Sequence, residues 1–257
     1  MSNKLGARHF VAATADAIRQ RGRAMLAAAP WSLALFILSL PFALLISNLF
    51  PYGNGLFMAL ALINLIALAR MTCAWHRVVK PGDLTGVGAH RGNAAQARHL
   101  ALLGALVITA TAMARATGDL PYVIYMVLAG SNDAVFWSAL CAALALIWVP
   151  TLYALAMYGL SLPRVAVTGK YGFQAARTAM PYKPWPLMLA LLMLIAAAGH
   201  AGYILGMLAY GYPDVGLARA AISALLCIPL VFVVAAMYAV AYRDSCEPAA
   251  RTPSSRP

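Results

Sequence analysis

Polar side chains inside long apolar stretches are the first candidates for chemistry in this sequence, because they are costly to bury in hydrocarbon without a partner or a task. His200 lies in the middle of the stretch 185–210, with Tyr203 on the same helical face. A neutral imidazole can form a hydrogen bond between helices, and it can also carry a proton or bind a metal or haem. The apolar stretches hold no second mid-depth histidine and no mid-depth carboxylate. We therefore expect a packing role with one hydrogen bond, and a proton or cofactor role is the alternative.

The stretch 55–76 contains two further polar residues. Asn64 is near its middle, where we expect a hydrogen bond to a neighbouring helix worth about 1 kcal/mol. Arg70 lies nearly two turns before its end, so its guanidinium can reach the membrane surface by snorkelling.

Arg115 and Arg219 lie near the ends of the stretches 100–116 and 216–242. The acidic residues within reach of them are Asp119, Asp133 and Asp214. We expect ion pairs at the membrane interface, which is the ordinary place for charged side chains near the end of a span.

Gly202 and Gly206 form a GxxxG pattern, which lets another helix approach closely. Pro41, Pro150 and Pro229 also fall inside apolar stretches and can kink their helices. We expect these prolines to serve packing. Broken helices that build a transport site are the alternative.

Six apolar stretches of this kind run through the chain, each near or above the ~20 residues that a spanning helix needs. They cover 31–50, 55–76, 100–116, 134–162, 185–210 and 216–242. The composition agrees, because 63% apolar and 10% charged residues would leave a soluble domain with too much apolar surface. The predicted fold class is all-α, a polytopic membrane helix bundle of six transmembrane helices in three hairpins with short amphipathic arms. The chain is a single membrane domain.

The basic residues define an orientation. Of the 19 Lys and Arg, all but Arg70, Arg115 and Arg219 fall at the two ends of the chain or in every second gap. Excess Lys and Arg mark the cytoplasmic side, so we expect both termini in the cytoplasm. The net charge of +12 does not predict nucleic-acid binding, because it is divided among four short segments. Residues 243–257 are expected to form a disordered cytoplasmic tail.

Residues 1–26 are predicted to form a cytoplasmic amphipathic arm, because apolar residues recur there near the helical period. Its arginines, Arg19, Arg21 and Arg23, can reach lipid phosphates, as can Arg77 after the second span. Anionic membrane lipids are therefore the predicted partners. The arm can simply anchor the first span, which we favour, or it can also sense anionic lipid.

The segment 120–130 is apolar but too short to cross the membrane. We expect a helix lying on the outer surface, and a re-entrant segment is the alternative. A pattern P-W-x-L-x-L precedes both the first and the fifth span, at 30–35 and 184–189. It suggests three parallel units, each an arm followed by two spans, although any helix entering lipid favours Trp and basic residues there.

Motifs of soluble enzymes are absent from the sequence. The glycine-rich segment 86–92 has the wrong spacing for a dinucleotide, and HExxH and GxSxG do not occur. The four cysteines form no CxxC pair, so neither a zinc site nor a disulfide framework is indicated. We expect neither an enzyme nor a bound cofactor.

Short motifs carry a family resemblance. The residues AWHR at 74–77, LPRVAV at 162–167 and a helix over 172–178 resemble a group of uncharacterised proteobacterial six-span inner-membrane proteins. More distantly they are similar to the membrane-anchor domain of bacterial glycerophosphodiester phosphodiesterases and YciC-type proteins. The resemblance implies a helical membrane domain without an activity of its own, because no phosphodiesterase domain is attached.

The sequence therefore predicts an integral inner-membrane protein without its own chemistry, acting as an accessory, scaffold or lipid-interacting component. Other membrane proteins are possible further partners. The alternative function is a small-molecule transporter or channel with a path near His200, Asn64 and the proline kinks.

Overall fold

The computed structural model describes residues 5–49, 55–79, 90–130, 133–212 and 216–246. Within these ranges the chain is helical, with one isolated bridge between Leu5 and Tyr182. The helices are α1 (Ala7–Ala28), α2 (Pro30–Leu49), α3 (Gly55–Val79), α4 (His90–Gly118), α5 (Leu120–Val127), α6 (Ala134–Gly159), α7 (Ser161–Thr168), α8 (Phe173–Ala179), α9 (Trp185–Ala209) and α10 (Leu217–Ser245). The predicted all-α membrane bundle is confirmed. The predicted disordered tail 243–257 is wrong at its start, because α10 continues to Ser245. Residues 247–257 lie outside the described residues.

Five helical stretches are long and apolar enough to cross a membrane. They are α3, α9, α10, the rod Ala94–Val127 made by α4 and α5, and the rod Ala134–Thr168 made by α6 and α7. The pair α1 and α2 gives a sixth if it counts as one span, although the two helices are bent by 84°. The bend falls where Ala29 leaves the helical conformation and Pro30 starts α2, because a proline suits the first position of a helix. The structure thus holds five or six spans, against six predicted.

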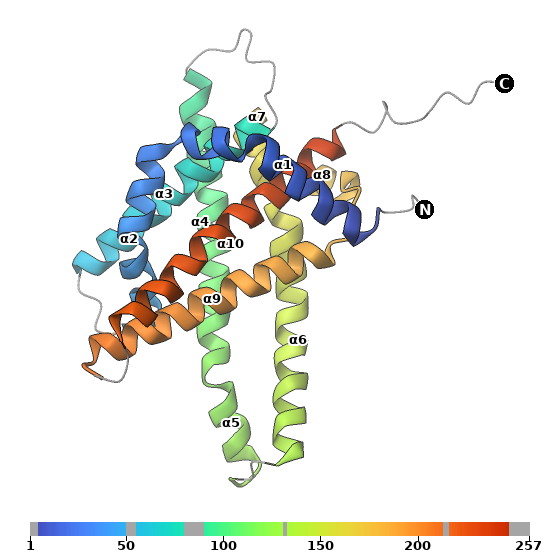
Figure 1. Cartoon of the computed structure of the whole chain (residues 1–257). Helices are drawn as coiled ribbons and strands as arrows, with labels where there is room; N and C mark the ends of the chain where they lie inside the picture. Colours follow the sequence, from blue (N-terminus) through green and yellow to red (C-terminus); the bar gives the residue numbers. More distant parts are fainter. Residues whose placement is uncertain (1–4, 50–54, 80–89, 131–132, 213–215, 247–257) are drawn as a thin grey trace, which may run out of the picture.

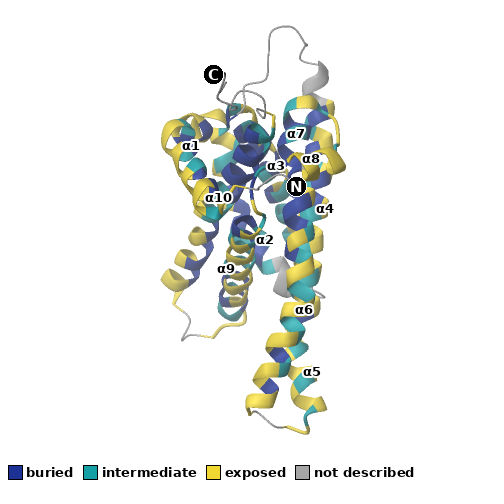
Figure 2. Ribbon diagram, turned by 90° about the vertical axis from the view of Figure 1, so that its right-hand side faces the viewer, coloured by how far each residue is buried: buried dark blue, intermediate teal, exposed yellow. Residues whose placement is uncertain are grey.

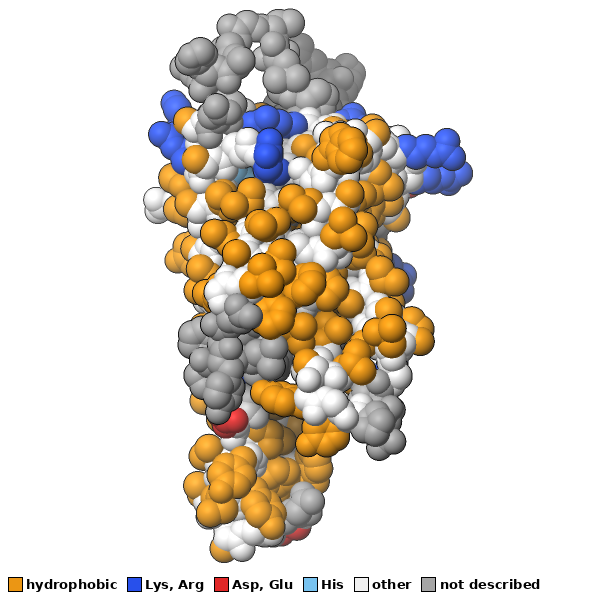
Figure 3. Space-filling model, turned by 90° about the vertical axis from the view of Figure 1, so that its left-hand side faces the viewer, with side chains coloured by type: hydrophobic (Ala, Val, Ile, Leu, Met, Phe, Trp, Pro, Cys, Tyr) orange, Lys and Arg blue, Asp and Glu red, His pale blue; other side chains and the backbone are white. Residues whose placement is uncertain are grey.

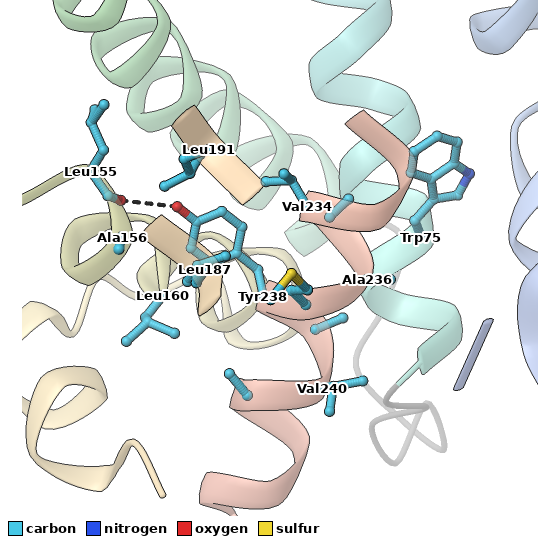
Figure 4. Packing of buried hydrophobic residues seen from close by; sticks show 14 of the residues in the cluster. Trp75, Leu155, Ala156, Leu160, Leu187, Leu191, Val234, Ala236, Tyr238 and Val240 are labelled. Carbon is cyan, nitrogen blue, oxygen red and sulfur yellow. Dashed lines mark hydrogen bonds between the residues drawn. The ribbon is translucent and has the colours of Figure 1, made fainter. Parts of the chain in front are cut away.

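The long helices pack as pairs around a shared core. Helix α2 packs along α3 and α9 along α10, and the two hairpins also contact each other. Figure 1 shows α4 and α6 running side by side, with α9 and α10 crossing them obliquely. The shared core lies where α3, α6, α9 and α10 meet, and Figure 4 shows part of it. Its largest members include Trp75, Met71 and Leu187, all fully buried.

The amphipathic arm is confirmed as a helix, α1, which lies across the end of the bundle (Figure 1). Its apolar side packs on α3 and α10 and buries Phe10, Ala17 and Met25. Arg21 also turns inward, because its guanidinium donates to the carbonyl oxygens of Val78 and Val79 at the end of α3. The arm therefore closes the last turn of α3, whose carbonyls have no partner inside the helix.

Both ends of the described chain meet at this same side of the bundle. The Leu5 amide donates to the Pro181 carbonyl at 2.8 Å, just before α9 begins. Tyr182 donates through its hydroxyl to Asp244 near the end of α10, and Arg243 donates to the other oxygen of that carboxylate at 2.9 Å. These contacts hold the arm, the start of α9 and the end of α10 together.

The segment 120–130 differs from the prediction. Helix α5 continues α4 as one apolar rod and does not lie flat across the bundle (Figure 1). Figure 2 shows it projecting beyond α9 without a buried side chain. Pro121 stands in the first turn of α5, where a proline is tolerated because its missing N–H would have no helical partner. The proline therefore does not prevent α5 from continuing in the direction of α4.

Candidate functional site

One end of the molecule is basic. Figure 3 shows Lys and Arg gathered there, while apolar side chains cover the sides. We call it the basic end, formed by α1, the end of α3, the start of α4, α7 and α8. Two of its arginines tie α7 in place, because Arg77 donates to the Ala166 carbonyl at 2.9 Å and Arg98 donates to the Gly169 carbonyl. Gly169 has a φ of 69°, the left-handed conformation that ends a helix and favours glycine.

Beneath α7 lies a buried polar cluster around His99. Its Nδ1 lies 3.2 Å from the Leu162 carbonyl oxygen, and its Nε2 lies 3.0 Å from the Thr72 hydroxyl. The Leu162 carbonyl can only accept, so Nδ1 is the donor in that contact. The Thr72 hydroxyl has one proton, and it also lies 2.8 Å from the Leu68 carbonyl oxygen on its own helix. His99 therefore joins α3, α4 and α7.

His76 lies beside His99, with the ring centroids 5.6 Å apart. Its Nδ1 and the Ser161 hydroxyl are buried and have no hydrogen-bond partner among the described residues. These residues also contain no group of three or more His, Cys, Asp or Glu that could hold a metal ion. The histidine pair lies where α3 and α4 meet.

A groove of about 280 Å³ lies between α3 and α4 near the basic end. Two polar residues line it, Arg70 from α3 and Gln96 from α4. The rest of the wall is apolar and consists of Ile66, Ala69, Ala97 and Leu100. Neither Arg70 nor Gln96 makes a side-chain hydrogen bond or an ion pair with any described residue.

A second pocket, of about 360 Å³, lies between α6 and α8. Arg177 and Gln174 line it from α8, together with aromatic residues. Tyr158 and Phe173 meet there edge to face, with centroids 5.5 Å apart. The two cavities thus share a composition, one arginine and one glutamine above an apolar or aromatic wall.

The polar residues predicted from the sequence do not form one site. His200 is exposed on the outer face of α9, and Tyr203 beside it is 56% exposed. Gly202 and Gly206 occupy the opposite, buried face. The close contact predicted for these glycines stays a prediction.

The predicted arginines are also dispersed. Arg19 and Arg23 are exposed on α1, and Arg115 and Arg219 are exposed near the opposite end from the basic end. The ion pairs predicted for Arg115 and Arg219 stay predictions. Asp133 accepts hydrogen bonds from the first amides of α6, and Asp214 lies outside the described residues.

Asn64 makes the kind of contact that its position predicts. Its Nδ2 donates to the Phe36 carbonyl at 2.9 Å and to the Ser39 hydroxyl at 3.0 Å, both on α2. We expect Asn64→Leu to lower stability by about 1 kcal/mol, the typical worth of such a bond in a membrane protein. Thermal unfolding in mild detergent measures it, with Met58→Ala on the exposed side of α3 as the control. An unchanged melting temperature would contradict this role.

His200 is exposed, so its substitution should not lower stability, in contrast to that of Asn64. His200→Leu should change the free energy of unfolding by no more than about 0.5 kcal/mol, because no described neighbour loses a contact. The same thermal assay checks it. A loss of about 2 kcal/mol or more would mean that this face of α9 packs against protein.

The sequence analysis missed His99, Thr72 and Gln96. His99 stands one residue before the predicted third span, 100–116, and so falls in the gap that precedes it. A usable signal was the spacing of Thr72 and His76, which places both polar residues on one face of a helix.

Fold and site together define a multi-pass helical membrane protein with a basic end and two polar-rimmed cavities on its outside. No protein-family model matches the chain, and no curated protein or solved structure matches it. The family resemblance therefore stays a prediction.

Proposed function

We propose that this protein is an accessory or scaffold component of a bacterial inner membrane, with both termini cytoplasmic, and that it binds anionic lipids along its basic end. It performs no chemistry of its own and needs no cofactor. Membrane lipids are its main partners, and other membrane proteins can dock on its apolar sides. This function also agrees with the resemblance to membrane-anchor domains.

The observation that carries the proposal is a set of outward-facing arginines that have no partner among the described residues. Arg19, Arg23, Arg70 and Arg177 are exposed and make no side-chain hydrogen bond or ion pair with any described residue. Anionic headgroups attract such residues by about 1 kcal/mol each near the surface. A basic helix on the membrane plane, held by its apolar face, adds to this attraction.

Transport is supported less well. The buried polar groups Asn64 and His99 join neighbouring helices through hydrogen bonds. The groove and the pocket described above lie between neighbouring helices with exposed lining residues, Arg70 and Tyr158 among them. His200, the centre of the predicted path, faces outward.

The test is lipid-dependent stability of the full chain in nanodiscs. We expect a melting temperature several degrees higher with phosphatidylglycerol than with phosphatidylcholine, because binding to the folded state stabilises it. High salt should reduce the difference through screening. The double variant Arg19→Gln, Arg23→Gln should reduce it as well. Equal melting temperatures in both lipids would refute the proposal.

Orientation is tested separately. Reporter fusions after Tyr171 and at the C-terminus should report the cytoplasm, and a fusion after Asn132 should report the periplasm. The reason is the placement of the basic residues. A periplasmic signal at Tyr171 would reverse the assignment of the basic end.

A further inference from the structure

We propose that the groove between α3 and α4 binds one anionic phospholipid, whose phosphodiester lies against Arg70 and Gln96. This inference rests on the proposed lipid binding and assigns it a discrete site. It differs from a general attraction to the basic end, because it predicts one retained lipid and named donors.

The position of Arg70 along α3 calls for a negative partner. It precedes Val79, the end of the helix, by nine residues, which is about 13 Å along the axis. The other residues that line the groove carry no charge. A guanidinium at this depth is costly unless it meets an anion or water, and a lipid phosphate is the anion that a membrane supplies at its surface.

Gln96 completes the set of donors. It is half-buried on the facing helix, and its side chain makes no hydrogen bond with a described residue. Guanidinium and amide groups together offer N–H donors from two helices to the oxygens of one phosphodiester. Hydrogen bonds from a guanidinium to phosphate are among the stronger ones, and they hold the ligand in one orientation.

The apolar surface below the groove fits the acyl chains. Leu62, Ile66 and Arg70 lie on one exposed stripe of α3 at helical spacing. Opposite them on α4 lie Ala97 and Ala101, two exposed residues whose small side chains leave room for an acyl chain. A lipid with its phosphate at Arg70 would thus lay a chain along Ile66 and Leu62, away from the basic end.

The surroundings favour a lipid with a net negative charge. A zwitterionic headgroup brings an ammonium group of its own, which Arg70 would repel. A soluble anion lacks the apolar part that would cover Ile66, Ala97 and Leu100. An anionic phospholipid is therefore the ligand that fits both parts of the site, because its phosphate contacts the cationic part and its acyl chain contacts the apolar part.

The experiment is native mass spectrometry of the full chain, purified in mild detergent with equal amounts of phosphatidylglycerol and phosphatidylcholine. We expect the wild type to retain one phosphatidylglycerol. Arg70→Gln should lower its retention about tenfold, the effect of losing a charge-assisted contact. Gln96→Leu should lower it less, and Arg70→Lys should keep part of it. Arg19→Gln is the matched control, because it removes the same charge from an exposed, unpartnered arginine of the basic end.

The outcomes separate the site from the broader function. Equal retention in wild type and Arg70→Gln would overturn the site, as would an equal loss in Arg70→Gln and Arg19→Gln, which indicates diffuse attraction. In both cases the lipid preference in nanodiscs would still stand. Retention of phosphatidylcholine as often as phosphatidylglycerol would also overturn the site. Loss of the preference in nanodiscs would instead refute the proposed function.

Discussion

Gly159→Ala is expected to destabilise the protein by about 1–3 kcal/mol, the usual cost of overpacking a tight interface. A Cβ at this position would overlap the ring and hydroxyl of Tyr238 on α10. Tyr238 is buried there and donates to the Leu155 carbonyl at 3.0 Å (Figure 4). A displaced ring would also lose that hydrogen bond. Thermal unfolding in mild detergent measures the effect.

Two controls make this prediction specific. Gly199→Ala changes a glycine whose Cβ would meet nothing within 4 Å, so it should be neutral or slightly stabilising. In a Tyr238→Ala background, Gly159→Ala should cost much less, because the two residues are in contact and their effects are not additive. Equal costs in both backgrounds would show that the glycine matters for another reason.

Phe10→Ala is expected to cost about 3–5 kcal/mol, as is typical of a buried aromatic residue. Phe10 is 0% exposed and stacks on Tyr182, with ring centroids 4.5 Å apart. The arm should then leave the bundle, and limited proteolysis should cut it before the spans. Lower melting temperature and faster cleavage within residues 7–28 are the two measurements.

The neighbouring residue supplies the control for the arm. Val11 is 55% exposed on the other side of α1, so Val11→Ala should leave both cleavage and melting nearly unchanged. If Phe10→Ala alters neither measurement, α1 is held by the membrane surface and not by its contacts with α3, α9 and α10.

The sequence predicted the elements well and their partners poorly. Apolar length predicted the regions of the chain in which the spans lie. This signal is local, because it depends on the composition of one stretch. Helical periodicity predicted an amphipathic helix over the arm but not its buried face, because the periodic residues Val11 and Leu26 are exposed while Phe10 is buried.

The site needed information that no single stretch contains. A span is apolar on all sides, so its pattern does not say which face meets protein and which meets lipid. His200 and Gly202 are two residues apart, yet one faces outward and the other is buried. His99 becomes meaningful only through Thr72 and the Leu162 carbonyl, which the fold brings to it from 27 and 63 positions away.

The unequal lengths of the hairpins have a consequence for the surrounding bilayer. The rod Ala94–Val127 has 34 residues and α9 has 25, which correspond to about 51 and 37 Å along their axes. One hydrocarbon core of about 30 Å does not match both. The tip of the longer hairpin stays apolar, with Val127 78% exposed. The protein thus carries a built-in hydrophobic mismatch, which tilt or local thickening must absorb. Its stability should therefore depend on acyl-chain length, and thicker membranes should suit it better than thin ones.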